Sequence, residues 1–374
     1  MNKSICLLFV SLALMACRTT DEEPDLMFPP SGNPGKIVGF YLLNEGPMGS
    51  NKSTIDYYDY STGIYTKNIC AAANPDLQII PGDVGNDIQI YGSRLYAVIN
   101  RSNNVLVMDA QDARYIGQVP VRNCRYIVFH DRYAYVSSYA DALEMDPGDF
   151  PGYVVKIDTA TMEVVDTCIV GNQPEEMVIA NGKLYVANSG IYRVPNYDHT
   201  VSVIDLDSFK ETGRIDVAIN LHRMELDSYG QIWVSSRGDD FDCHSQIYVI
   251  SSENDQVICD FGDIPCNDMA LCGDSLYVIS YTYNFMTVTY DICYYIVDVK
   301  QNEIISSNFI TDGTEQDIQA PYGIAVNPQT HEILITDALD QVTPGTLYCF
   351  SPDGQLKWQC HTGDIPSRIV FYKK

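Results

Sequence analysis

The sequence lacks the short motifs that mark common catalytic and nucleotide-binding sites. It contains no G-x-S-x-G, no H-E-x-x-H, no glycine-rich phosphate loop and no EF-hand spacing. Its 6 histidines are scattered, and there is no C-x-x-C pair, so a zinc site is not expected. These absences favour a binding protein over an enzyme, and we expect no catalytic residues, no metal and no cofactor.

Basic residues are also scarce. The 374 residues include 23 Lys and Arg against 49 Asp and Glu, which gives a net charge of −26 at pH 7. Nucleic acids and anionic membrane surfaces are poor candidates as partners, because both require clustered Lys and Arg. The acidity does not indicate disorder, since 46% of the residues are hydrophobic and 27 are tyrosines.

Long apolar runs are missing except at the N-terminus. There an apolar run at 5–15 follows Lys3 and ends just before Cys17. It is too short to span a membrane and has the form of a signal peptide. Leu-Met-Ala before the cysteine resembles the bacterial lipoprotein cleavage box. We therefore expect a signal peptide at 1–16 and lipidation of Cys17; an ordinary secretory signal is the alternative.

The segment 17–36 is rich in proline, glycine and charge, and we interpret it as a flexible tether. Its Asp21-Glu22-Glu23 resembles the acidic tag of surface-exposed lipoproteins in Gram-negative gut bacteria. This resemblance implies a lipid-anchored protein on the cell surface, in the outer membrane.

The cysteines do not form a recognisable disulfide framework. Of the 12, Cys6 lies in the signal peptide and Cys17 is the expected lipid anchor, which leaves 10 (12 − 2). Most of them fall inside predicted strands, where a free thiol acts as a small apolar side chain. Disulfides are the alternative, and Cys349 with Cys360 on neighbouring predicted strands is the first pair to test.

A four-strand pattern repeats along the chain. In the copy at 171–215, an apolar strand, a turn at Asn181-Gly182, the strand LYVAN, a longer loop, the strand TVSVIDL, a short turn and a last strand follow one another. Four antiparallel strands form one propeller blade. The third strand of each copy ends in an acidic or hydroxyl residue, and these residues are Asp59, Asp109, Asp158, Asp205, Ser251, Asp298 and Ser351. The sequence therefore predicts an all-β, seven-bladed β-propeller over 37–374.

The first copy lacks its opening strand. Residues 367–371 at the C-terminus follow GDIP, as other opening strands follow GNQP and GDIP. We expect them to complete blade one by pairing with the strand at 37–43, whose other neighbour is 54–60. Such closure leaves no open sheet edge.

Loop lengths identify the face that carries function. Connections between first and second strands and between third and fourth strands are tight turns, whereas the second-to-third loops are long. The predicted long loops are 44–54, 139–152, 189–199, 236–245, 281–293 and 337–345. They emerge on the same side as the fourth-to-first connections, which we call the long-loop face; the opposite side is the tight-turn face. Long loops on a rigid scaffold usually carry binding.

Each opening strand begins with two residues that break the apolar pattern, and they differ from blade to blade. Such variation at the channel mouth indicates an asymmetric ligand; a hydrated channel lined by polar strand ends is the alternative. With residues from the ends of the second strands and the long loops, the candidate ligand-binding residues are Asn44, Asn86, Asp87, Asn100, Arg101, Arg125, Tyr126, Tyr139, Glu176, Asn188, Arg223, Arg237, Asp268, Tyr281, Tyr283, Tyr322, Asp337 and Arg368. His222 alone of the histidines falls in the ring and is interpreted as a hydrogen-bonded spectator.

The phrases LYVAN, SVIDL and GNQP resemble the YncE-like seven-bladed propellers, and IVGFYLLNEGPMGSNKSTIDYYD resembles their surface-lipoprotein branch in gut Bacteroidetes. That branch includes the BtuG-type lipoproteins, which capture cobamides over the outer-membrane vitamin B12 transporter. The resemblance implies a corrinoid ligand, carried rather than used as a cofactor, and a TonB-dependent transporter as partner. A wide face with varied Asn, Asp, Ser, Arg and Tyr partners suits the amide-fringed macrocycle.

Two other functions stay open. One is an adhesion or assembly propeller whose loops bind a protein or a glycan. The other is a lactonase-like hydrolase with Ca²⁺ held by oxygen ligands such as Glu176, Asn188, Asp268 and Asp337.

Overall fold

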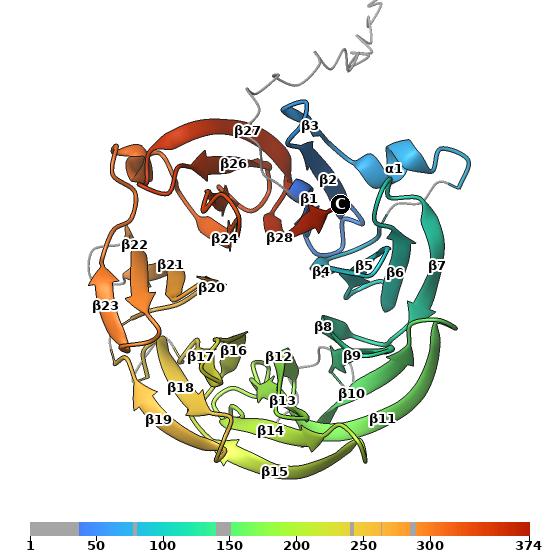
Figure 1. The fold of residues 1–374 in the computed structure, drawn as a ribbon, viewed down its shortest axis with the longest axis vertical. Coiled ribbons are helices and arrows are strands. Elements are labelled where there is room, and N and C mark those ends of the chain that lie inside the picture. Colours follow the sequence, from blue (N-terminus) through green and yellow to red (C-terminus); the bar gives the residue numbers. More distant parts are fainter. Residues whose placement is uncertain (1–36, 78–80, 140–150, 240–242, 263, 285–288) are drawn as a thin grey trace, which may run out of the picture.

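The computed structural model describes residues 37–77, 81–139, 151–239, 243–262, 264–284 and 289–374. The expected signal peptide, Cys17 and the tether lie outside these residues. The described strands form seven four-stranded antiparallel sheets arranged around a central channel (Figure 1). The predicted seven-bladed β-propeller is confirmed.

In each blade the strands follow one another from the channel outward. Blade 1 contains β28 (Pro366–Lys373), β1 (Ile37–Asn44), β2 (Thr54–Asp59) and β3 (Ile64–Thr66), and blade 2 contains β4 (Gly85–Tyr91), β5 (Arg94–Ile99), β6 (Asn104–Asp109) and β7 (Tyr115–Pro120). Blade 3 contains β8 (Cys124–His130), β9 (Tyr133–Ser138), β10 (Pro151–Asp158) and β11 (Glu163–Asn172), and blade 4 contains β12 (Pro174–Ala180), β13 (Lys183–Asn188), β14 (Thr200–Asp205) and β15 (Lys210–Asp216).

The remaining blades repeat this arrangement. Blade 5 contains β16 (Leu221–Leu226), β17 (Gln231–Ser236), β18 (Gln246–Ser251) and β19 (Gln256–Asp260), and blade 6 contains β20 (Asp268–Cys272), β21 (Ser275–Asn284), β22 (Thr289–Asp298) and β23 (Glu303–Ser306). Blade 7 contains β24 (Pro321–Val326), β25 (Ile333–Asp337), β26 (Pro344–Phe350) and β27 (Leu356–Asp364). A short helix, α1 (Ile69–Ala73), and a 3₁₀ turn, η1 (Thr314–Gln316), lie in connections.

The residues that mark the sequence repeat have a structural reason. Asp59, Asp109 and Asp298 each end a third strand, and each carboxylate accepts a hydrogen bond from the backbone N–H two residues later, at 2.7, 2.7 and 2.9 Å. Such a bond fixes a tight turn. These acidic residues therefore stabilise the turn into the outermost strand of blades 1, 2 and 6.

Closure of the ring occurs as predicted. β28 pairs antiparallel with β1, and Ile37 is opposite Lys373, so both ends of the described chain lie on the tight-turn face. The inner strands of blades 7 and 1 approach closely here, because a Cβ built on Gly323 would lie 1.9 Å from the carbonyl oxygen of Ser367. The joint between the chain ends therefore tolerates no side chain at this glycine.

The hydrophobic core is divided among the interfaces between blades. Seven clusters of buried side chains occur among the described residues, one for each pair of neighbouring blades. Between blades 4 and 5, for example, Tyr185 and Ala187 pack against Leu221 and Ile232. Each blade is thus stabilised by both neighbours, and the ring positions the inner strands rigidly around the channel.

One predicted long loop is largely a strand hairpin. The loop expected at 281–293 is wrong, since β21 and β22 pair from Ser275 opposite Asp298 to Asn284 opposite Thr289. Tyrosine and threonine continue the alternation at this point, and both favour a pleated ladder. Blade 6 therefore extends a hairpin on the long-loop face.

All ten cysteines of the described chain are free thiols. Cys349 is opposite Trp358, and Cys360 is opposite Leu347, so the pair that was considered for a disulfide is diagonal rather than directly cross-strand. No helix of the described chain is both long and apolar enough to span a bilayer.

Candidate functional site

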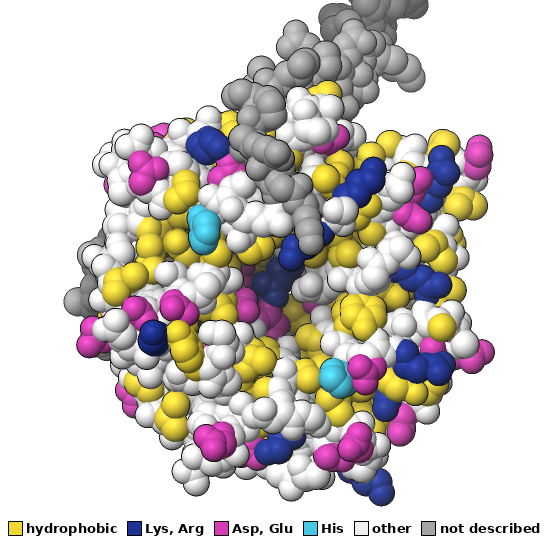
Figure 2. Space-filling view, viewed as in Figure 1, with side chains coloured by type: hydrophobic (Ala, Val, Ile, Leu, Met, Phe, Trp, Pro, Cys, Tyr) yellow, Lys and Arg dark blue, Asp and Glu magenta, His cyan; other side chains and the backbone are white. Residues whose placement is uncertain are grey.

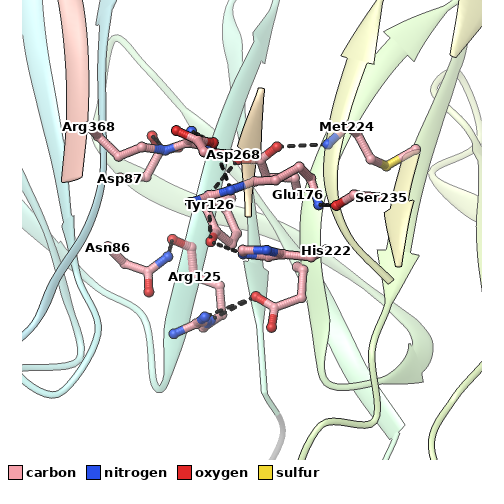
Figure 3. A network of polar contacts seen from close by, with 12 residues as sticks. Asn86, Asp87, Arg125, Tyr126, Glu176, His222, Met224, Ser235, Asp268 and Arg368 are labelled. Atoms are coloured by element: carbon pink, nitrogen blue, oxygen red, sulfur yellow. Dashed lines mark hydrogen bonds and ion pairs between the residues drawn. The ribbon is translucent and has the colours of Figure 1, made fainter. Parts of the chain in front are cut away.

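Two consecutive positions of every inner strand form two layers across the channel, and Figure 3 shows part of both layers. The inner layer consists of Asp87, Tyr126, Glu176, Arg223, Asp268, Gly323 and Arg368. The mouth layer, one residue closer to the long-loop face, consists of Asn86, Arg125, Glu175, His222, Asn267, Tyr322 and Ser367. The structure thus brings together most of the predicted ring.

The acidic residues of the inner layer connect neighbouring blades. Asp87 accepts a hydrogen bond from Ile127 N at 3.0 Å, Glu176 from Met224 N at 2.8 Å, and Asp268 from Ile324 N at 3.0 Å. Each donor belongs to the inner edge of the next blade, where no further strand can pair with it. Carboxylates from blades 2, 4 and 6 therefore satisfy backbone N–H groups of blades 3, 5 and 7.

Two arginines neutralise part of this layer. Arg223 binds Glu176 and Asp268, each at 2.9 Å. Arg368 binds Asp268 at 3.2 Å and also forms an ion pair with Glu176. Both guanidinium groups lie over the Tyr126 ring, at 5.6 and 5.5 Å from its centroid. The inner layer is therefore a connected network rather than a set of free side chains.

Burial raises the pKa values of Asp87 and Asp268 above the ordinary value, although Arg368 beside Asp87 and Arg223 beside Asp268 act in the opposite direction. A charged carboxylate loses hydration in the channel, and the arginines restore only part of that loss.

In the mouth layer one carboxylate is shared by two arginines, Arg125 of the layer itself and Arg237, which directly follows β17. The Glu175 carboxylate, fully buried, binds Arg125 at 3.0 Å and Arg237 at 3.2 Å, and it accepts a hydrogen bond from the Tyr139 hydroxyl at 2.6 Å. Burial alone would raise the pKa of Glu175, but Arg125 and Arg237 outweigh it and lower that pKa to about 2. Two guanidinium groups thus share one carboxylate, and their side chains stay 17% and 24% exposed.

His222 is neutral in this setting. Burial, together with Arg237, Arg223 and Arg125, holds its pKa well below the ordinary range. Arg223 donates to the Tyr126 hydroxyl, which in turn lies 3.0 Å from Nε2 of His222. The neutral imidazole therefore shares one hydrogen bond with that hydroxyl through Nε2. The role of a hydrogen-bonded spectator fits this geometry.

Glu45 is a member of the mouth that the sequence did not single out. Its carboxylate accepts a hydrogen bond from Tyr322 at 3.0 Å. Burial raises the pKa of Glu45 to about 7, against the opposing effects of Tyr322 and Arg125. The sequence feature that could have identified Glu45 as a mouth residue is its position directly after β1, where the chain enters the predicted loop 44–54.

Four predicted ligand contacts lie inside the scaffold. Asn44 and Asn188 are fully buried, and their amides donate to third-strand side chains, at 2.9 Å to Asp56 and 2.9 Å to Ser202. Asn100 donates to the Cys124 carbonyl at 2.9 Å, and buried Asp337 accepts from Ala320 N at 2.8 Å. In this structure these four residues stabilise strand ends, because the polar groups there need partners once buried.

The other predicted residues are distributed around the mouth. Asn86 donates to the Arg125 carbonyl at 2.7 Å, and Arg101 is exposed. Tyr281 stacks on Tyr290, with 4.1 Å between ring centroids. The side chain of Tyr283 lies outside the described residues.

A cavity of about 320 Å³ occupies the channel between the inner layer and the tight-turn face. Asp87, Glu176 and Arg368 line its inner end, and Gln89 and Glu225 line its wall. Figure 2 shows the hollow at the centre of the ring, with basic and acidic side chains inside it. Gln89 and Glu225 are not among the residues predicted from the sequence, although each lies two residues after an inner-layer residue and hence on the same side of its strand.

Within the described ranges, no group of three or more His, Cys, Asp or Glu is arranged to hold a metal ion. The inner-layer carboxylates instead bind arginines and backbone N–H groups.

Comparison with solved structures shows the same fold in proteins of very different sequence. A quinoprotein alcohol dehydrogenase-like protein from Bacteroides thetaiotaomicron is 16% identical with a TM-score of 0.57, over 89% of this chain and 78% of that one. Hydrazine synthase from Kuenenia stuttgartiensis is 15% identical with a TM-score of 0.57, over 72% of this chain and 77% of that one. At such identities the likeness concerns the fold alone.

No curated protein matches the chain. The family described as "Domain of unknown function (DUF5074)" matches residues 38–343, and the chain therefore belongs to that family.

Proposed function

We propose that this propeller is a non-catalytic binding protein that holds a small polar ligand at the mouth layer, on the long-loop face. The observation that carries the proposal is the charge of the mouth, where Arg125 and Arg237 share the single carboxylate of Glu175 and keep part of their surface exposed. With His222 neutral, Arg125, Arg237 and Glu175 together carry one excess positive charge in a protein whose net charge is −26. Glu45, whose pKa is raised to about 7, is only partly ionised near neutral pH and offsets only part of that charge. Such a site attracts an anionic or acceptor-rich group.

The arginines are also fixed in position before any ligand arrives. The Arg125 guanidinium lies 4.9 Å from the centroid of the Tyr139 ring and is bound to Glu175. A group that is already ordered loses little conformational entropy on binding. The mouth therefore offers preorganised donors beside aromatic edges.

A corrinoid is the ligand that we place first, on the resemblance of the sequence phrases to cobamide-capturing lipoproteins. Its nucleotide phosphate would bind the mouth arginines, and its amide fringe would meet Asn86 and the tyrosines around the mouth. In this proposal the protein is a lipid-anchored surface protein that passes the ligand to a TonB-dependent transporter of the outer membrane.

Isothermal calorimetry with cyanocobalamin tests the proposal. We expect binding by the intact protein and a loss of about 10- to 150-fold in affinity for Arg237→Gln, because a hydrogen bond to a charged group contributes about 1.5–3 kcal/mol. Arg214→Gln is the matched control, since Arg214 also binds a glutamate, Glu211 at 2.8 Å, but on the outer strand β15.

Equal losses in the two variants, or no heat of binding at micromolar cyanocobalamin, would reject the corrinoid. An adhesion function would then take precedence. It is favoured by the stacked Tyr281 and Tyr290, because Tyr290 is 49% exposed on the extended hairpin of blade 6 and such aromatics bind proteins and sugars.

A further inference from the structure

The channel cavity, defined above as the space of about 320 Å³ below the inner layer, is separate from the mouth. Its volume lies at the lower end of the range of about 300–1,000 Å³ that is typical of ligand pockets. Small or aliphatic residues occupy most of the wall, for example Val128, Val178 and Ala270. Gln89 and Glu225 occupy the equivalent strand position in blades 2 and 5, so the cavity has two polar groups in a mainly apolar wall.

Glu225 is not neutralised by the protein. It takes part in none of the ion pairs of the described chain, and its carboxylate accepts a hydrogen bond from the backbone N–H of Leu271. Arg223, the arginine that acts electrostatically on Glu225, already binds both Glu176 and Asp268. A carboxylate that lines a cavity with one donor has capacity for further donors.

The surroundings of the cavity carry an excess of negative charge. When Glu225 is ionised, four carboxylates, those of Asp87, Glu176, Glu225 and Asp268, belong to the cavity and the adjoining inner layer, against two guanidinium groups of Arg223 and Arg368. A cation that enters the cavity would offset this excess, and the apolar wall would strengthen its attraction to the carboxylates by excluding water.

We propose that the channel cavity binds a small aliphatic ammonium compound, a short diamine in particular, through the Glu225 carboxylate and the Gln89 amide oxygen. An ammonium group has three donors and no acceptor, which suits these two acceptors. The second ammonium group of a diamine offsets the remaining excess of negative charge, and its methylene chain suits the aliphatic wall.

Proton linkage supports the same assignment. Burial and the nearby Asp268 carboxylate raise the pKa of Glu225 to about 8, although Leu271 N–H and Arg223 act in the opposite direction. Asp87, Glu176 and Arg368 are the other charged groups of the cavity lining. Near neutral pH the Glu225 carboxyl therefore holds a proton, which an ammonium ligand displaces.

Calorimetry with 1,4-diaminobutane tests the inference, with uncharged 1,4-butanediol as the ligand control. We expect the diamine to bind and the diol not to bind. Glu225→Gln should weaken diamine binding by at least about tenfold, whereas Glu303→Gln should leave it unchanged. Glu303 is the matched control because it is an exposed glutamate on the outer strand β23 of the same acidic protein.

A second variant and a pH series are added so that the test of the inference does not rest on Glu225→Gln alone. Gln89→Leu keeps the carboxylate and should weaken binding by about 2- to 10-fold. In the wild type, affinity should rise about tenfold per pH unit below about pH 8 and level off above it, and Glu225→Gln should abolish this slope. The inference is wrong if the diol binds as well as the diamine, if Glu225→Gln and Glu303→Gln have equal effects, or if Gln89→Leu binds as tightly as the wild type.

Discussion

Glu175 is the residue on which the mouth layer depends, because Arg125, Arg237 and Tyr139 all bind its carboxylate. Its folded-state pKa of about 2 lies below the ordinary value of 4.5. A depressed pKa contributes stability that is complete above about pH 4.5 and is lost as the pH falls towards 2. Protonation of this one side chain should therefore loosen the whole mouth.

We predict that Glu175→Gln lowers the free energy of unfolding at pH 6 by about 3–5 kcal/mol, because it leaves two partly buried arginines without their counter-charge. The difference between variant and wild type should shrink steadily between pH 4.5 and pH 2. Urea unfolding at several pH values measures it. Glu303→Gln, an exposed control, should show no such trend, and a difference that stays constant down to pH 2 would contradict the assigned pKa.

At the residue scale, the sequence predicts where polar side chains gather but not what they bind. The pairs that open each inner strand are visible as breaks in an apolar pattern, and the structure places them in the channel. Their partners lie one or two repeats away, as Arg125 and Glu175 do, so spacing alone cannot reveal the ion pair. Asn44 and Asn188 show the converse error, because a polar residue at a strand end gives no sign of being fully buried.

At the scale of elements, β28 connects the two ends of the ring. It pairs with β1 along its length, and Ser367 Oγ donates to the Leu43 carbonyl at 3.2 Å. We predict that deletion of 367–374 causes a far larger drop in the melting temperature than deletion of Lys374 alone, which lies beyond the strand. The deletion exposes an inner-edge strand and removes the contacts of blade 1 with blades 2 and 7.

A synthetic peptide that spans 364–374 provides the control. Added to the truncated protein, it should restore much of the lost melting temperature, because it can pair with the vacant edge of β1. A truncated protein that melts within a degree or two of the parent would contradict the role assigned to β28.

Elements of regular length were predictable, because turn chemistry and strand alternation recur in every blade. The hairpin of β21 and β22 was not, since its continuation to Asn284 and Thr289 depends on cross-strand pairs such as Tyr281 with Ile292. A short tyrosine-rich segment is compatible with both a loop and a strand. The segment becomes a strand only where a partner strand pairs with it, and the repeat pattern of the sequence does not reveal that pairing.

At the scale of the whole molecule, the expected lipid anchor determines where the ring works. Cys17→Ala should release the protein from the membrane fraction, because the acyl chains are its only expected attachment. External protease should cleave the wild-type protein in intact cells. Immunoblots of fractionated cells measure both outcomes, with Cys70→Ala as a control that removes a buried thiol of the propeller. Protection of the wild type from protease would place the protein on an inner leaflet instead.

The pairing of Ile37 with Lys373 has a consequence for how an anchored ring would face its surroundings. The chain enters the propeller on the tight-turn face, so a molecule attached at Cys17 would sit with that face towards the bilayer and with the mouth arginines directed to the medium. A ligand captured from outside would then be held on the side remote from any membrane transporter. Nineteen residues (18–36) lie between Cys17 and Ile37, and this segment can reach at most about 70 Å when extended, which leaves enough length for the ring to tip over. Delivery would consequently require a change of orientation, and the length of the tether, rather than the binding face, would set how easily that change occurs.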